Sequence, residues 1–201
     1  MRKQILFFVV LVAVSVPGQV SNWLTPSDEQ ITKAIDLGFQ GQKPPYHMQS
    51  FNPQKSKVGD DYRQQPSISV VTPLLCAYGS GLNAHNALKD KPDFAIVKRA
   101  CFDRIIVTAV HISPSLNASW PVVLERSGTR LQPASSQPDK LPGVTRYTTP
   151  FGSSAGYQYT DRYIFVAPQE WADGFQLTYA DDDGKHHTVD IKTSLFIGDT
   201  K

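Results

Sequence analysis

The pattern of hydrophobic and polar positions changes character along the chain. Near the N-terminus, Ile31, Ala34 and Ile35 recur at the spacing of a helix. From Phe102 onward, apolar and polar residues alternate over short runs that are separated by turn residues, a pattern typical of strands. We therefore expect a short helix in the N-terminal part and a β-rich C-terminal half.

The first helix is expected to begin at Thr25 and to stop at Gly38. Thr25 can act as the N-cap, Pro26 suits the first helical position, and Asp28 complements the positive end of the helix dipole. A helix of this length is barely stable alone, so its apolar stripe is expected to pack against another element.

A long polar segment follows this helix. Residues 40–66 are poor in aliphatic side chains and rich in Gln, Lys, Pro and Gly, which indicates a loop or linker. We therefore divide the chain into a signal peptide (1–18), a helix with a polar linker or extension (19–66) and a β-sandwich domain (67–201) with a helical insertion near 82–100.

Within the last segment, the pattern predicts a series of short strands. The β-branched run 67–76 predicts a strand, whereas 82–100 is ambiguous between a short helix and a connector. Alternation predicts a strand over 103–112. A hairpin is expected over 120–133, with its turn at Ser127-Gly128.

The remaining strands complete a layered architecture. Residues 134–143 are expected to form a loop, 157–168 a central strand, and 175–179 with 187–197 the last pair. Short strands with turns every 8 to 12 residues or so indicate a two-layer antiparallel sandwich. In outline this half resembles the immunoglobulin-like sandwiches of secreted proteins, although it lacks their Cys-Trp-Cys signature. The predicted fold class is mainly β.

The N-terminus has the features of an export signal. Arg2 and Lys3 precede the apolar run 5–17, which is shorter than the roughly 20 residues that a membrane-spanning helix needs. Small residues favour cleavage near Gly18. We expect a secreted or periplasmic protein without a stable membrane span after cleavage; the alternative is a retained N-terminal anchor.

The charge balance limits the class of binding partner, and the cysteine content bears on the redox state of the cellular compartment. The chain has 20 Lys and Arg and 18 Asp and Glu, so removing Arg2 and Lys3 leaves 18 of each sign. A neutral chain argues against a nucleic-acid partner, which requires a basic face. Cys76 and Cys101 are expected to form a disulfide in an oxidising compartment, and two buried free thiols are the alternative.

The acidic stretch 181–187 resembles a metal site only in composition. Asp181, Asp182 and Asp183 are contiguous, so they cannot converge on one ion as the alternating ligands of an EF-hand do. Position 12 of such a loop, counted from Asp181, requires a Glu but is Lys192 here. Neighbouring His186 and His187 would point to opposite faces of a strand. We predict a solvated hairpin with its turn at Asp183-Gly184, and no metal or cofactor.

Two glycine-flanked serines are candidates for nucleophile motifs. Gly152–Gly156 matches G-x-S-x-G with Ser154 in the nucleophile position, but it lacks the strand before and helix after that the motif requires. A flexible loop is therefore expected there, and a turn at Tyr78–Asn83. His85 and His111 are isolated and are expected to be surface or hydrogen-bonded core histidines, so no catalytic residue is predicted.

A group of aromatic residues is the best lead to function. Tyr157, Tyr159 and Tyr163 would share one face of a strand, with Trp171 close behind, and an exposed face of this kind would bind a ligand. Alternatively, these rings face the interior. We predict a non-enzymatic protein that binds an unknown protein or carbohydrate partner through its sandwich; the alternative is a hydrolase of the cell envelope or of polysaccharide.

Overall fold

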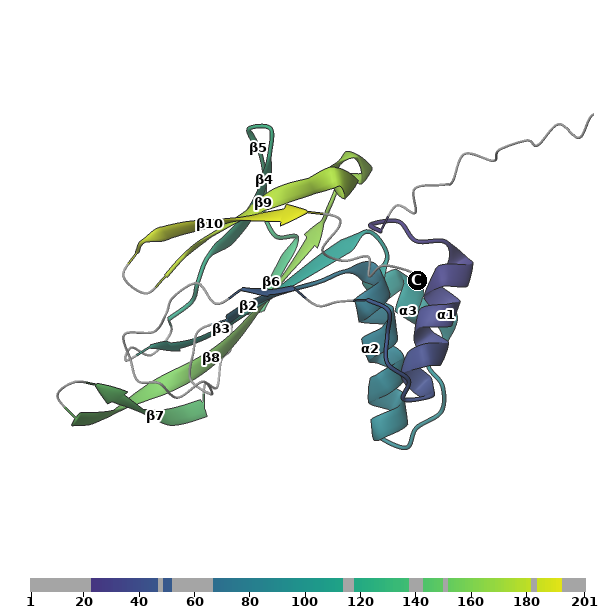
Figure 1. The fold of residues 1–201 in the computed structure, drawn as a ribbon, viewed down its shortest axis with the longest axis horizontal. Helices are drawn as coiled ribbons and strands as arrows, with labels where there is room; N and C mark the ends of the chain where they lie inside the picture. Colours follow the sequence, from purple (N-terminus) through teal and green to yellow (C-terminus); the bar gives the residue numbers. More distant parts are fainter. Residues whose placement is uncertain are drawn as a thin grey trace, which may run out of the picture.

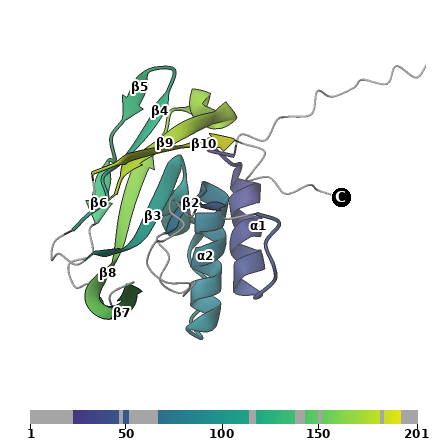
Figure 2. The same ribbon diagram turned by 60° about the vertical axis from the view of Figure 1, so that its left-hand side comes forward.

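The structure is a computed structural model that describes residues 23–46, 49–51, 67–113, 118–137, 143–149, 152–181 and 184–192. This part of the chain is mainly β, with two antiparallel sheets and three short α-helices (Figure 1). The arrangement is consistent with a β-sandwich; the immunoglobulin-like type stays a prediction. The helices lie together on one side of the sheets in both views (Figure 2). The expected signal peptide and residues 52–66 lie outside the described residues.

The larger sheet has the order β1-β2-β3-β8-β6, and β7 pairs with the first part of β8. All of these pairs are antiparallel. The strands are β1 (Gln49–Phe51), β2 (Ser67–Val71), β3 (Arg104–Ser113), β6 (Ser135–Gln137), β7 (Gly143–Thr149) and β8 (Gly152–Val166). Two predicted loops are therefore wrong: 134–143 contains β6, and Gly152–Gly156 begins β8, because both segments find a ladder along this long strand.

The smaller sheet has the order β10-β9-β4-β5. Its strands are β4 (Val122–Arg126), β5 (Thr129–Leu131), β9 (Gly174–Ala180) and β10 (His186–Lys192). The β4–β5 hairpin turns at Ser127 and Gly128, whose φ angles of 49° and 80° fit the positive values that a two-residue hairpin turn requires. This prediction is confirmed.

The main hydrophobic core lies between the two sheets. The ladder of β3 with β8 places Ile105, Val107 and Ala109 on the core face, and Leu124 and Leu177 face them from the smaller sheet. Val110 and Ile112 lie on the opposite face of β3, outside this core. Trp23 and Leu24 close one end of this core, where the Trp23 indole N–H donates to the carbonyl of Ala172 at 2.5 Å.

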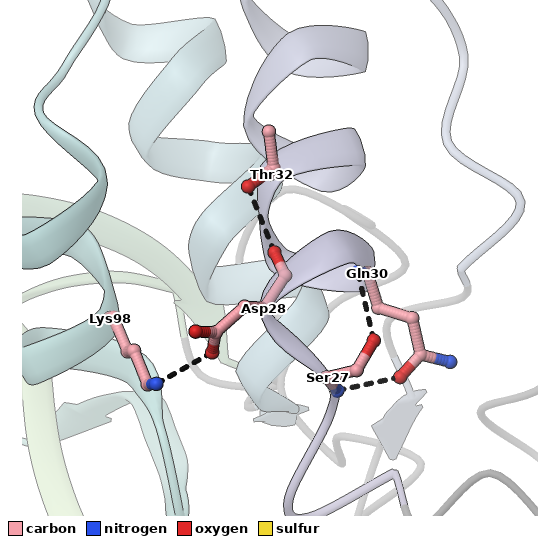
Figure 3. Close-up of polar contacts among 5 residues, drawn as sticks. All are labelled: Ser27, Asp28, Gln30, Thr32 and Lys98. Atoms are coloured by element: carbon pink, nitrogen blue, oxygen red, sulfur yellow. Dashed lines mark hydrogen bonds and ion pairs between the residues drawn. The ribbon is translucent and has the colours of Figure 1, made fainter.

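Helix α1 (Asp28–Phe39) begins directly after its N-cap residue Ser27, and not at Thr25 as predicted. Ser27 and Gln30 form a capping box. The Ser27 hydroxyl accepts from the Gln30 backbone N–H at 3.2 Å, and the Gln30 side chain accepts from the Ser27 N–H at 2.8 Å (Figure 3). The Asp28 carboxylate reaches the Lys98 ammonium at 2.6 Å, which joins the start of α1 to α3.

Helix α2 (Pro73–Asn86) replaces the second half of the strand predicted over 67–76. The strand ends at Val71 because Thr72 caps the helix and Pro73 fits its first turn, where a missing N–H costs nothing. The residues Tyr78–Asn83, predicted as a turn, lie inside this helix. The segment 82–100 therefore contains the end of α2 and most of α3.

Glycines bring α1 and α2 into backbone contact. A Cβ added at Gly81 would lie closer than 3.0 Å to the Ile35 carbonyl oxygen and 2.9 Å from the Phe39 nitrogen. A Cβ at Gly38 would lie 2.8 Å from the Leu82 nitrogen. Gly38 therefore serves close packing, and α1 continues past it to Phe39, contrary to the prediction that it stops the helix.

Helix α3 (Phe94–Cys101) is capped by Asp93, whose carboxylate accepts from the Ile96 N–H at 3.1 Å. A disulfide joins Cys76 in α2 to Cys101 in α3, which confirms the predicted bond. The helices share a second, smaller core made of Ile31, Ala34, Ile35, Ala77, Val97 and Cys101. Within the described residues, no helix is both long and apolar enough to cross a membrane.

Candidate functional site

Five aromatic rings stack in a row between the two sheets. In order they are Tyr159, His111, Trp120, Tyr179 and His187, and we call them the ring stack. Successive ring centroids lie 5.1, 4.8, 5.5 and 4.9 Å apart, with interplanar angles between 13° and 17°. The rings come from both layers of the sandwich, so the stack connects the larger sheet to the smaller one.

Strand register places these rings opposite one another. His111 in β3 is the Cα partner of Tyr159 in β8, and Tyr179 in β9 is the partner of His187 in β10. Residues directly opposite on antiparallel strands share a face and have closely spaced Cβ atoms. Trp120 lies two residues before β4 and between the two pairs, where its ring contacts His111 on one side and Tyr179 on the other.

A buried histidine–carboxylate pair lies at one end of the stack. The His111 Nε2 and the Asp161 Oδ2 are 3.2 Å apart, and both side chains are 0% exposed. The same carboxylate oxygen accepts from the Trp120 backbone N–H at 3.2 Å, and the Tyr163 hydroxyl donates to the Trp120 carbonyl at 2.6 Å. Burial, followed by the charge of Asp161, raises the pKa of Tyr163.

A second pair lies at the other end, beside the β9–β10 turn. The His187 Nε2 and the Asp181 Oδ2 are 2.7 Å apart, and the other carboxylate oxygen accepts from the Lys185 N–H at 2.9 Å. Burial, followed by the Asp181 charge, raises the pKa of Tyr179 to about 12. Asp181 is therefore a buried residue that organises the hairpin, and the prediction of a wholly solvated turn is wrong for it.

These two pairs have the same side chains as the histidine–carboxylate part of an acid–base site. A histidine oriented by a carboxylate is the arrangement that activates a nucleophile in many hydrolases. In the first pair, however, both faces of the His111 ring are covered by Trp120 and Tyr159, and the side chain is fully buried. The pair lies within the larger sheet, and its carboxylate also accepts from the Trp120 N–H in the segment that leads into β4, so the geometry suits a buried polar network.

The four residues predicted to bind a ligand lie largely in this interior. Tyr159, Tyr163 and Trp171 are buried, and Tyr157 is half-buried. Trp171 lies in a short 3-10 helix, η2 (Gln169–Asp173), and belongs to the main core. Their burial matches the interior orientation that the sequence left open; ligand binding by these residues stays a prediction.

The metal motif is only partly described, because Asp182 and Asp183, and with them the predicted turn at Asp183-Gly184, lie outside the described residues. His186 is exposed and His187 turns inward, so their side chains lie on opposite faces as expected. No group of three or more His, Cys, Asp or Glu side chains that could hold a metal ion occurs in the described part of the chain. Ser154 lies in the continuous strand β8 and not in a strand–turn–helix elbow; its side chain is outside the description, so its predicted distance from any histidine is untested.

The sequence did not reveal the pairing of His111 with Asp161. The two residues are 50 positions apart, and only the β3–β8 register brings them together. Alternation along β3 places His111 on the face opposite to Val110 and Ile112. That observation would have placed it in the core if the core face had been assigned to Ile105 and Val107.

A surface groove provides the second candidate. It has a volume of about 450 Å³ and lies where α3 leads into β3; we call it the α3 groove. Its lining residues are Phe94, Ala95, Lys98, Arg99, Phe102, Asp103 and Arg104. The Lys98 ammonium lies 5.8 Å from the Phe94 ring centroid and 5.6 Å from that of Phe102. The groove therefore combines aromatic rings with positive charge.

Comparison with known proteins finds no family model, no curated protein and no solved structure that matches this chain. What the protein does is therefore argued from its own residues.

Proposed function

We propose that this is a secreted or periplasmic, non-enzymatic protein that binds a protein or carbohydrate partner through its β-sandwich domain. The N-terminal sequence supports export, because Arg2 and Lys3 precede a short apolar run that ends near Gly18. The disulfide between Cys76 and Cys101 supports the same compartment, since such bonds persist where the environment is oxidising.

One observation carries the choice of binding over catalysis. The His111–Asp161 pair, which has the atoms of an acid–base dyad, is enclosed between the layers with both side chains 0% exposed. An active site needs converging polar groups that a substrate can reach. One accessible concavity is the α3 groove, whose aromatic and basic side chains suit recognition more than bond cleavage.

Export is tested by fractionating the native cells and determining the N-terminus of the protein by mass spectrometry. We expect the protein in the periplasmic or secreted fraction, with its first residue close to position 19. Recovery of the full-length chain from the cytoplasm, with both cysteines reduced, would contradict the proposal.

Partner binding is tested with the purified, oxidised protein immobilised through its C-terminus. Envelope and secreted fractions are passed over it, and each retained component is purified and titrated against the protein in solution. We expect saturable binding of at least one component. Absence of saturable binding, together with multiple turnover of an envelope polymer, would favour a hydrolase of the cell envelope or of polysaccharide.

The alternative, a cell-envelope or polysaccharide hydrolase, is favoured by one feature. His187 and Asp181 are 2.7 Å apart, and the His187 side chain is 17% exposed. His186 next to it is exposed and makes a matched control. Hydrolysis that is lost in His187→Ala and retained in His186→Ala would establish this alternative, whereas our proposal expects no hydrolysis by the wild-type protein.

A further inference from the structure

The helical spacing of α3 builds one wall of the α3 groove. Phe94, Lys98 and Phe102 follow one another at intervals of four residues, so they line one face at successive turns. Ala95 and Arg99 have the same spacing beside them. The chain then turns at Asp103, which has a φ of 55°, and enters β3 with Arg104 at the groove. A single continuous segment therefore supplies both walls.

The groove carries an excess of positive charge. Its lining contains Lys98, Arg99 and Arg104 against the single acid Asp103. Lys98 is already paired with Asp28, toward which Figure 3 shows it turned. Arg99 is exposed. The two guanidinium groups are therefore the cations with capacity for an anionic ligand.

Arg104 supplies the second guanidinium group of the groove. Its Nε atom is buried, and its N–H donates to no acceptor in the described structure. A guanidinium can bind both oxygens of a carboxylate through two parallel hydrogen bonds. The Nε atom itself is out of reach of a ligand, so a ligand carboxylate in the groove would pair with the terminal nitrogens of Arg104.

Apolar surface adjoins the cations. The rings of Phe94 and Phe102 are half-buried in the groove. Val166 is the Cα partner of Arg104 across the β3–β8 ladder, so it lies on the same face, and it is 46% exposed. A ligand that presents an acid next to an apolar side chain would therefore match both parts of this surface.

We propose that the α3 groove binds an acidic peptide segment of a partner protein. A carboxylate of the peptide pairs with Arg104 and Arg99, and a neighbouring apolar side chain packs against Phe94 and Phe102. A peptide fits better than a charged sugar, because the polar lining side chains are all charged and offer no amide or hydroxyl groups to sugar hydroxyls. This inference rests on the proposed function and specifies its partner and site.

The test uses fluorescence anisotropy with the oxidised full-length mature protein. The probe is a dye-labelled peptide of alternating glutamate and leucine; a lysine–leucine peptide of equal length and a labelled oligouronate serve as comparisons. We expect saturable binding of the acidic peptide only, weakening as the ionic strength rises. A tighter complex with the oligouronate would overturn the peptide assignment.

Two substitutions locate the site. Arg104→Gln is expected to weaken binding by about 10- to 100-fold, since it removes a charge-assisted pair. Arg99→Gln is expected to weaken it as well, and it should leave folding unchanged because the position is exposed. Arg130→Gln is the matched control: it removes an exposed arginine on β5, whose only described partner is Glu125 and which lies far from α3 (Figure 1).

Each outcome decides the proposal. Equal affinities for the wild type and both groove variants would overturn it, as would an equal loss in the Arg130→Gln control. If a purified native partner binds the protein but is insensitive to Arg104→Gln and Arg99→Gln, the groove assignment fails and the proposed function stands. If the acidic peptide binds the groove but no native component binds, the proposed function fails instead.

Discussion

Backbone contact between α1 and α2 makes a prediction with a control in the same helix. Gly81→Ala introduces a methyl group closer than 3.0 Å to the Ile35 carbonyl oxygen, with the Phe39 nitrogen 2.9 Å away. Gly79→Ala, two residues earlier in α2, introduces the same group where no atom lies within 4 Å apart from its chain neighbours and the backbone of its own helix. The two substitutions therefore differ in the contact that they create and not in their chemistry.

The expected magnitude follows from two opposing terms. Replacing a helical glycine by alanine stabilises the helix by about 1 kcal/mol, and this gain is common to Gly79 and Gly81. Overpacking at a tight contact costs about 1–3 kcal/mol. The obstacles at Gly81 are backbone atoms, which cannot rotate away, so the upper end applies. We expect Gly79→Ala to be stabilising and Gly81→Ala to lie about 3 kcal/mol below it.

The measurement is urea unfolding of both variants with the disulfide intact, followed by far-UV circular dichroism. The difference in the free energy of unfolding between them isolates the overpacking term. Equal stabilities would show that α1 and α2 are not in backbone contact at Gly81, and that these glycines reflect some other constraint than close packing.

Three further predictions concern the disulfide, the ring stack and alkaline pH. The double substitution Cys76→Ser, Cys101→Ser should lower the free energy of unfolding by about 3.5 kcal/mol in urea, the chain-entropy value for this loop, and no loss would contradict it. Asp161→Ala should destabilise by about 3–5 kcal/mol, measured likewise, because it breaks a buried pair with His111; a loss below about 1 kcal/mol would mean that the pair is solvated. The pKa of Tyr179 is raised from 10.0 to about 12, so between these pH values the folded protein keeps a proton that the unfolded chain releases. The free energy of unfolding should therefore fall as the pH rises from 10 to 12. Tyr179→Phe should reduce that fall, and an unchanged pH profile would refute the shift.

Local patterns predicted much of the fold. The hairpin at Ser127-Gly128 was predictable because its turn needs two residues that tolerate positive φ. The disulfide followed from a lone pair of cysteines in an exported chain. The helix over Pro73–Asn86 was missed, since Tyr78-Gly79-Ser80-Gly81 contains residues with poor helix propensity. Tertiary packing overrode that propensity, because the second glycine allows α1 to approach.

The candidate sites were less predictable because they depend on register and on contacts between distant segments. The pairing of His111 with Asp161 requires the β3–β8 alignment, which alternation alone does not fix. Asp181 is one of three consecutive aspartates, and nothing in the sequence indicates that it is buried. The basic and aromatic residues of the α3 groove were visible in sequence, but the ambiguous prediction for 82–100 concealed that they share a helix face.

The central claim is that the His111–Asp161 pair is enclosed between the two sheets, where a substrate does not reach it. The most direct test is the rate at which diethyl pyrocarbonate modifies each histidine of the native protein, mapped by mass spectrometry. His85 and His186 are exposed and should react quickly, whereas His111 is 0% exposed and should react only after unfolding. Modification of His111 in the native state as fast as His85 would contradict the claim.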